Sequence, residues 1–202
     1  MSQPDTLLLT MERAPSPSSS KSAPRFDRTS AAILDAAARV FSEEGAGANL
    51  ATVAVAAGIS RATLYRYYAN REALLEALTA DALDAVARRL ADANLERATV
   101  EDAIERILRA FVAVGDRYAV LTNDQATLEA AHGELAAPLH DVLARGIETG
   151  VLRDDLPVEI LYEFLAGTIL KAIALNQQHR LGLEEASATA ASFFLNGTRS
   201  RD

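Results

Sequence analysis

The sequence predicts an all-α protein of about nine helices, in which an N-terminal helix-turn-helix unit precedes a larger helical domain. Two observations support this fold class. Apolar residues recur at helical spacing along the chain, including a long alanine- and leucine-rich stretch over residues 71–93. Residues that begin or end helices separate these stretches: Asn49, Ser60 and Asn70 precede helices, and Gly58 and Gly150 follow them.

Residues 49–71 have the spacing of a helix-turn-helix. The apolar stripe of the first helix, at i, i+3, i+4 and i+7, consists of Leu50, Val53, Ala54 and Ala57. Gly58 can adopt the positive φ that ends a helix, and Ile59 returns to the core before Ser60 caps the next helix. Two short helices joined by a glycine turn also occur as an ordinary corner of a helical protein.

The second helix of this motif, residues 61–68, is the one expected to lie in the DNA major groove. Leu64 and Tyr68 fall on its inner face, four residues apart. Arginine can bond guanine through two nitrogens, alanine can meet a thymine methyl group, and hydroxyl groups suit phosphate oxygens. The residues expected to contact DNA are Arg61, Ala62, Thr63, Tyr65, Arg66, Tyr67 and Arg71.

Residues 28–75 resemble the N-terminal domain of the TetR family of bacterial transcriptional regulators. The resemblance rests on ILDAAARVFSEEG and on AGISRATLYRYYANREALLEAL, which follows the family pattern A-G-V-S-x-x-T-L-Y-x-Y/H-F-x-x-K/R-E-x-L with Tyr68 for phenylalanine and Ile59 for valine. It implies phosphate contacts from Thr63, Tyr65, Tyr67 and Arg71, and base or phosphate contacts from Arg61, Ala62 and Arg66. Leu50, Ala51 and Thr52 open the first helix of the motif, where relatives often place a hydroxyl or a basic residue. The resemblance therefore assigns no base contact to that helix.

The formal net charge of −8 is unevenly distributed. Residues 21–75 carry seven basic and five acidic side chains, whereas the region from residue 76 onwards is strongly acidic. Because phosphate binding depends on the field within a Debye length of about 10 Å, an acidic second domain is compatible with a DNA-binding face. So few cations per subunit favour a dimer that presents two copies of the motif.

Composition also narrows the functional classes. The chain has no cysteine, so it has no disulfide framework and no thiolate metal site, and a cytoplasmic location is expected. No apolar run reaches the length of a membrane span. His132, His140 and His179 lack metal-ligand spacing, and no glycine-rich phosphate loop or G-x-S-x-G motif occurs. We therefore expect no enzyme activity, no metal and no cofactor.

The N-terminal segment, residues 1–27, is rich in proline and serine and is predicted to be a disordered tail. Its basic residues either form an arm that touches the DNA backbone or belong to a solvated leader. Residues 28–75 are the predicted DNA-binding domain, and residues 76–202 the predicted effector-binding and dimerisation domain. Thr99 to Asp102 resembles a helix-capping box, a short segment around 126–131 is followed by a helix over 135–148, and the last two helices are predicted over 158–179 and 183–197.

The last two helices are apolar around more than one face, which is typical of helices that are buried on several sides. The expected arrangement is a twofold four-helix interface, and the alternative is a single monomer core. The predicted interface residues are Ile160, Leu161, Leu165, Ile169, Leu170, Ile173, Phe193 and Phe194. The candidate lining of an effector pocket between the helices is Phe111, Tyr118, Asn123, Gln125, His132, His140, Tyr162 and Phe164.

The functional prediction is a ligand-responsive regulator, most often a repressor in this family, that binds a palindromic operator as a homodimer and is released by a small-molecule effector. The alternative is a helical ligand-binding or scaffold protein whose helix-turn-helix does not bind DNA. A helical-bundle enzyme is a second rival, which would turn over a small molecule and ignore DNA.

Overall fold

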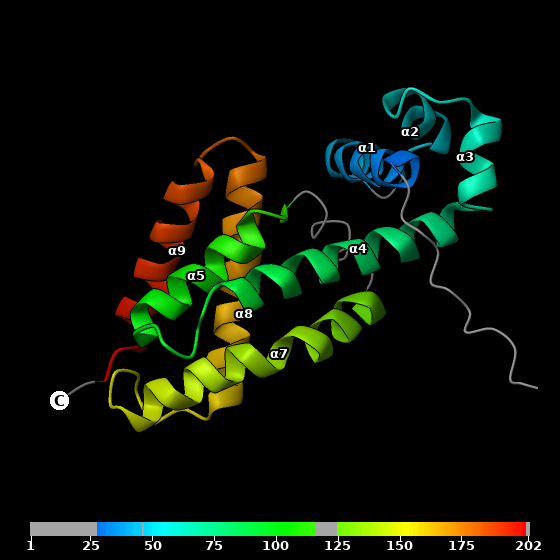
Figure 1. Ribbon diagram of the computed structural model, residues 1–202. Helices are drawn as coiled ribbons and strands as arrows, with labels where there is room; N and C mark the ends of the chain where they lie inside the picture. Colours follow the sequence, from blue (N-terminus) through cyan, green and yellow to red (C-terminus); the bar gives the residue numbers. More distant parts are fainter. Residues whose placement is uncertain (1–27, 46, 116–124, 201–202) are drawn as a thin grey trace, which may run out of the picture.

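The computed structural model describes residues 28–45, 47–115 and 125–200, with only the backbone described over 125–134. This part of the chain is helical and contains no β-strand, although Leu152 and Arg199 form one isolated bridge. The predicted all-α class is confirmed, with eight helices in the described residues against about nine expected (Figure 1). The helices are α1 (Arg28–Glu44), α2 (Leu50–Ala56), α3 (Arg61–Tyr67), α4 (Arg71–Asp92), α5 (Val100–Val112), α7 (Gln125–Glu148), α8 (Val158–Gln177) and α9 (Leu183–Thr198).

Two hydrophobic cores lie along the chain, and α4 enters both. Leu74 and Leu78, in its first two turns, pack with α1, α2 and α3, whereas Val86 and Leu90 pack with the C-terminal helices. Figure 1 shows α4 running from the small α1–α3 unit into the larger bundle. A rigid helix shared by two cores is suited to transmit a displacement from one to the other.

The predicted caps form as expected. Asn49 Oδ1 accepts a hydrogen bond from the Ala51 N–H at 2.8 Å, and Asn70 Oδ1 accepts one from the Ala73 N–H at 2.8 Å. Thr99 Oγ1 accepts from the Asp102 N–H at 3.2 Å. These bonds satisfy amide groups that the first turn of a helix leaves without partners. Local side-chain chemistry therefore fixes where three of these helices begin.

Helix α7 corrects one sequence prediction. The short segment around residues 126–131 is the first part of a single helix that continues to Glu148 and contains Pro138. Proline removes one backbone hydrogen bond and crowds the carbonyl four residues earlier, so it usually interrupts a helix. Here α7 packs against α4, α5 and α8, and Leu139, Val142 and Leu143 are buried by those contacts. Tertiary burial thus outweighs the local cost of the proline.

Helices α8 and α9 differ from the sequence prediction of a dimer interface. Of the eight residues predicted to form a dimer interface, five are buried in the chain's own core: Leu161, Leu165, Ile169, Ile173 and Phe194. Leu170 is half-buried against the same core. The reason is that α5 packs on both α8 and α9 and covers their inner faces, so a partner subunit is not needed to bury these side chains. Only Ile160 and Phe193 of the predicted set reach the surface, at 42% and 77% exposure.

Across the described residues, none of the helices combines the length and the apolar character that a membrane crossing requires.

Candidate nucleic-acid interface and internal cavities

The turn between α2 and α3 is held by backbone hydrogen bonds. The Gly58 N–H donates to the Val55 carbonyl and the Ile59 N–H donates to the Ala54 carbonyl, each at 3.0 Å. Gly58 has a φ of +68°, a conformation that residues with a Cβ rarely adopt. The chain therefore reverses direction in the few residues that a helix-turn-helix allows.

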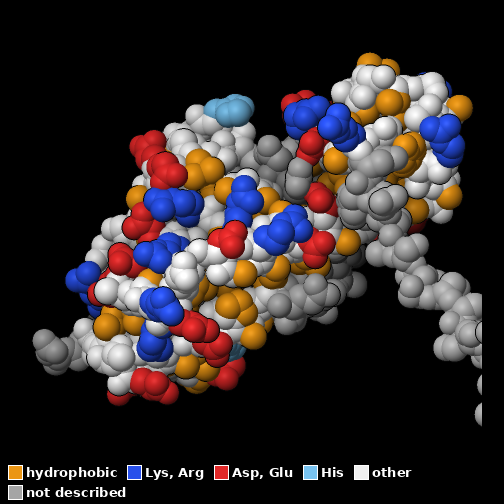
Figure 2. Space-filling model, viewed as in Figure 1, with side chains coloured by type: hydrophobic (Ala, Val, Ile, Leu, Met, Phe, Trp, Pro, Cys, Tyr) orange, Lys and Arg blue, Asp and Glu red, His pale blue; other side chains and the backbone are white. Residues whose placement is uncertain are grey.

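Helix α3 has one buried face and one exposed face. Ser60 Oγ accepts from the Thr63 N–H at 3.1 Å and starts the helix, and Leu64, only 1% exposed, anchors it in the N-terminal core. Four of the predicted DNA-contacting side chains are exposed: Arg61, Ala62, Tyr65 and Arg66. Thr63 and Tyr67 are half-buried. Figure 1 places α3 at the end of the molecule farthest from the C-terminal bundle, and Figure 2 shows arginine and apolar side chains on the surface of this lobe.

The cations of α3 are available to a ligand. In the described part of the chain neither Arg61 nor Arg66 forms an ion pair, and the Arg66 guanidinium lies 5.6 Å from the centre of the Tyr67 ring. That contact favours one orientation of the arginine without neutralising it. Thr63 Oγ1 shares a hydrogen bond of 2.9 Å with Ser60 Oγ, so its hydroxyl is already oriented at the first turn.

The end of α3 is fixed to the start of α1. Tyr68 is buried, and its hydroxyl shares a hydrogen bond of 2.8 Å with Ser30 Oγ. Sequence analysis identified Tyr68 as an inward residue but missed Ser30, which lies 38 positions earlier. A buried tyrosine in place of phenylalanine was the available signal, because a buried phenol hydroxyl requires a partner.

Arg71 does not face outward as the sequence analysis expected. Its Nη1 donates to the Ala48 carbonyl at 2.5 Å, and its guanidinium lies 4.9 Å from the centre of the Phe41 ring. The Nη2 atom is buried as well. These contacts direct the side chain back over the α1–α2 loop, so Arg71 links the start of α4 to that loop. Its predicted phosphate contact stays a prediction.

The C-terminal bundle contains a small cavity of about 10 Å³ between α5, α7 and α8. Phe111 and Tyr162, both candidates for the effector pocket, line this cavity together. His140 stands against Tyr162, with ring centres 4.5 Å apart. Burial, and secondarily the charge of Glu163, raises the pKa of Tyr162, so the neutral phenol is favoured at this site.

The other pocket candidates do not join this group. Phe164 is 61% exposed on the outer face of α8, which corrects its assignment to the interior. Tyr118 and Asn123 lie outside the described residues, and Gln125 and His132 lie in the part of α7 whose side chains are not described. Phe111, His140 and Tyr162 are therefore the candidates that the structure brings together.

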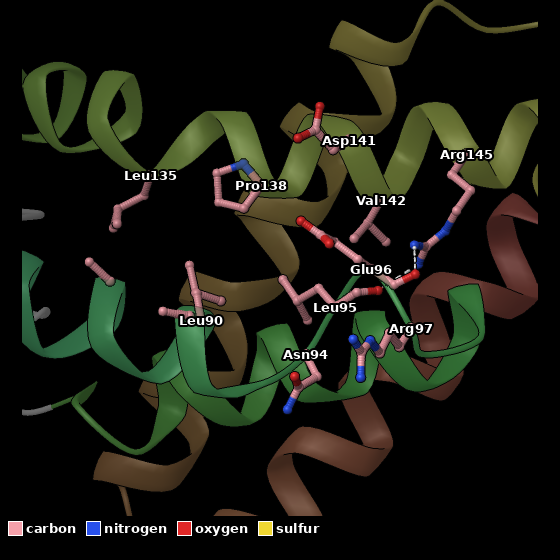
Figure 3. Close-up of a pocket in the computed structure, with 12 residues that line it drawn as sticks. Leu90, Asn94, Leu95, Glu96, Arg97, Leu135, Pro138, Asp141, Val142 and Arg145 are labelled. Carbon is pink, nitrogen blue, oxygen red and sulfur yellow. Dashed lines mark hydrogen bonds between the residues drawn. The ribbon is translucent and has the colours of Figure 1, made fainter.

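Sequence analysis missed a larger cavity of about 570 Å³ between the C-terminal end of α4 and α7 (Figure 3). Leu90, Leu95 and Pro138 contribute apolar surface, and the Glu96 side chain points toward α7. Arg145 closes one end, because its guanidinium donates to the carbonyls of Leu95, Glu96 and Ala98 at 2.8, 2.9 and 3.2 Å. No local pattern marked this site, since it depends on a loop and a helix about 50 residues apart.

No group of three or more histidine and acidic side chains among the described residues is arranged to hold a metal ion.

Comparison with known proteins identifies the N-terminal unit. Residues 33–78, which contain all of α2 and α3, match the model of the tetR family of bacterial regulatory proteins. The N-terminal unit of this chain is therefore a domain of the tetR family of bacterial regulatory proteins. The match covers α1 from Ile33 and continues into α4, and the segment coincides with the N-terminal core of this chain.

Similarity to TetR-family relatives extends beyond this segment. The HTH-type transcriptional repressor KstR2 of Mycobacterium tuberculosis is 29% identical over 150 residues, covering 67% of this chain and 75% of the relative. The fatty acid metabolism regulator protein of Bacillus subtilis is 24% identical over 152 residues, covering 68% and 77%. The transcriptional repressor LfrR of Mycolicibacterium smegmatis is 37% identical over 94 residues, covering 44% and 47%.

Solved structures share the fold of this chain. The ketosteroid transcriptional regulator KstR2 of Mycobacterium tuberculosis aligns with a TM-score of 0.70 at 21% identity, covering 87% of this chain and 97% of the other. LfrR from Mycobacterium smegmatis, solved with proflavine, aligns at 0.69 and 22% identity, covering 84% and 96%. FadR from Bacillus subtilis, solved with stearoyl-CoA, aligns at 0.65 and 20% identity, covering 83% and 98%.

Proposed function

We propose that this TetR-family protein is an effector-controlled repressor that binds a palindromic operator as a homodimer through α3. The observation that supports the proposal most directly is the division of α3 into two faces. Leu64 anchors the helix, and Arg61 and Arg66 stand exposed and without ion pairs in the described part of the chain. A helix anchored on one side and cationic on the other has the form of a recognition helix.

The proposed DNA contacts follow from this orientation. Arg61, Ala62 and Arg66 face base edges or phosphates, and the hydroxyls of Thr63, Tyr65 and Tyr67 bind phosphate oxygens. Arg71 is assigned a positioning role, because its guanidinium already bonds Ala48. Each subunit therefore supplies two arginines from α3, and two subunits double that number.

The proposed dimer uses the outer faces of α8 and α9. Phe164 and Phe193, at 61% and 77% exposure, line an apolar groove of about 440 Å³ between these helices, and Ile160 lies one turn before Phe164. Glu163 and Lys171 are also part of the lining. Large exposed aromatic side chains on one surface favour association, and the same surface on a second copy gives a twofold four-helix arrangement.

The proposed effector site is the cavity that Phe111 and Tyr162 line. At about 10 Å³ it holds no small molecule in the present arrangement, so a ligand must displace side chains of α5, α7 and α8. Because α4 packs against α5 and α7, such a displacement changes the position of α4 and hence of α3. If the effector weakens operator binding, bound DNA weakens effector binding by the same factor. The coupling free energy between two such sites is typically about 1 to 3 kcal/mol.

Two relatives indicate the kind of effector. FadR was solved with stearoyl-CoA and LfrR with proflavine, and both ligands have a large apolar part. The lining that the described residues give this cavity is also apolar apart from the Tyr162 hydroxyl. We therefore propose an effector with an apolar body for this protein.

The test is selection of genomic DNA fragments by the purified protein at fixed salt. The variant Arg61→Ala/Arg66→Ala removes two exposed cations of α3, and Arg97→Ala, an exposed arginine beyond the end of α4, is the matched control. We expect one palindromic sequence to be enriched by the wild-type protein and by Arg97→Ala but not by the double variant. Failure of the wild-type protein to enrich any sequence, with and without a mixture of acyl-CoA thioesters, would favour the scaffold alternative.

A further inference from the structure

Another cavity, of about 440 Å³, lies where α1 meets the C-terminal bundle. We call it the junction cleft. Its lining comes from α1, α4 and the ends of α5, α8 and α9, and it includes Arg39, Arg88, Arg89 and Asn176. The cleft thus brings side chains of the DNA-binding unit and of the C-terminal bundle to one space.

The junction cleft is basic in a chain that is acidic overall. Among the described residues three arginines line it and Asp35 is the one carboxylate, whereas the whole chain has a formal charge of −8. Within the described residues Arg39 and Arg89 form no ion pair, and Arg88 reaches only the exposed Asp84, at 3.9 Å. Like charges around one space repel each other, and a bound anion removes that repulsion.

We propose that the junction cleft binds a compact, multiply charged phosphate-bearing anion between Arg39 of α1 and Arg88 and Arg89 of α4. The planar guanidinium group can donate two parallel hydrogen bonds to phosphate oxygens, which a lysine cannot do. The volume of the cleft admits a group larger than a single phosphate. The position is distinct from the cavity that Phe111 and Tyr162 line, so the anion is a second ligand.

The anion that we propose for the junction cleft is not a phosphate of the DNA backbone. Arg88 lies 17 positions after Arg71 along α4, and at a rise of 1.5 Å per residue this is about 25 Å from the start of the helix. The recognition helix α3 ends just before α4 begins, so a duplex bound to α3 lies at the opposite end of α4 from these arginines (Figure 1). Figure 2 shows that Lys and Arg side chains also lie on the surface where the two lobes meet.

A side-chain hydrogen bond beside the junction cleft joins α1 to the C-terminal bundle. A ligand in the cleft is therefore expected to affect how the DNA-binding unit is held. Gln177 Nε2 donates to Ser42 Oγ of α1 at 3.0 Å and to the Gly115 carbonyl at 3.3 Å. Gly115 and Asn176, the neighbour of Gln177, both line the cleft. An anion bound between Arg39 of α1 and the arginines of α4 therefore adds a second connection between α1 and the bundle. It lies next to the hydrogen bond from Gln177 to Ser42. We expect it to restrict how far α1 moves against α4.

The test measures binding of inorganic pyrophosphate to the full-length protein by titration calorimetry, with sodium chloride added to hold the ionic strength constant. We expect saturable binding with one site per chain. Arg39→Gln and Arg89→Gln should each weaken it by about tenfold or more, the loss expected for a charged hydrogen-bond partner. Arg97→Gln, which removes an exposed arginine outside the cleft, should leave the affinity unchanged.

Three results would overturn the proposal. The first is no pyrophosphate binding by the wild-type protein, and the second is binding that Arg39→Gln/Arg89→Gln leaves intact. The third is loss of operator affinity in this double variant without added pyrophosphate, which would assign the arginines to DNA. Because the titration contains no DNA, its outcome is independent of the proposed repressor function. Thermal unfolding of each variant, measured without ligand, confirms that loss of binding is not loss of the fold.

Discussion

The Arg71 guanidinium donates to the Ala48 carbonyl at 2.5 Å and lies over the Phe41 ring, so the first residue of α4 fastens the loop between α1 and α2. The two residues are 23 positions apart, and Ala48 immediately precedes the cap of α2. The orientation of the helix-turn-helix thus depends on a side chain that sequence analysis assigned to DNA.

Replacing Arg71 by alanine is expected to destabilise the N-terminal unit. The variant loses a charged hydrogen bond to a carbonyl and a cation–ring contact, which together cost about 2 kcal/mol. Urea unfolding followed by circular dichroism measures the change. Arg66→Ala is the control: its side chain is exposed, so the free energy of unfolding should stay within about 0.5 kcal/mol of the wild-type value.

The salt dependence of operator binding separates positioning from phosphate contact. Each lost phosphate contact reduces the slope of log K against log salt by about 1. We expect Arg66→Ala to reduce the slope, and Arg71→Ala to lower affinity while leaving the slope unchanged. A reduced slope in Arg71→Ala would contradict the inward orientation of this side chain.

Neighbouring phenylalanines on α9 provide a matched test of the dimer. Phe193 is 77% exposed and Phe194 is 3% exposed, so the first side chain faces solvent and the second lies in the core. Phe193→Ser should leave the chain folded and produce monomers in light scattering. Phe194→Ser should instead unfold the bundle, because loss of a buried phenylalanine costs about 3 to 5 kcal/mol. If Phe193→Ser stays dimeric, the α8–α9 groove is not the interface.

These two residues also show where sequence analysis reaches its limit. Helical spacing identified α8 and α9 and their apolar character, but it does not distinguish burial by α5 within the chain from burial by a second chain. Leu161 and Ile160 are adjacent and both apolar, yet only the first is buried in the core. The caps at Asn49, Ser60 and Asn70 were predictable because the bonds join residues two or three positions apart. The contacts of Arg71 and Tyr68 join residues 23 and 38 positions apart, and no local pattern encodes them.

The dependence of the melting temperature on alkaline pH tests the burial of Tyr162. Burial raises its pKa, so the folded state holds the phenol proton more tightly than the unfolded state does. The resulting stabilisation is fully present below the tyrosine pKa of the unfolded chain, about 10, and is lost as pH rises through the higher value of the folded chain. The melting temperature should therefore fall less between pH 9 and pH 11 in Tyr162→Phe than in the wild-type protein. Tyr65→Phe, which removes an exposed tyrosine, should keep the wild-type profile.

The hydrogen bond from Gln177 to Ser42 is expected to couple the two units of the chain. Both side chains are half-buried, and Gln177 also bonds the Gly115 carbonyl, so its removal leaves two acceptors without this donor. We expect Gln177→Ala and Ser42→Ala each to cost about 0.5 to 1.5 kcal/mol and to show a non-additive double-mutant cycle. Hydrogen exchange should become faster in α1 when either partner is changed. Gln178→Ala, at the exposed position that follows, is the control. Additive losses with unchanged exchange in α1 would mean that the contact does not restrain the DNA-binding unit, and the coupling between effector and operator would then depend on α4 alone.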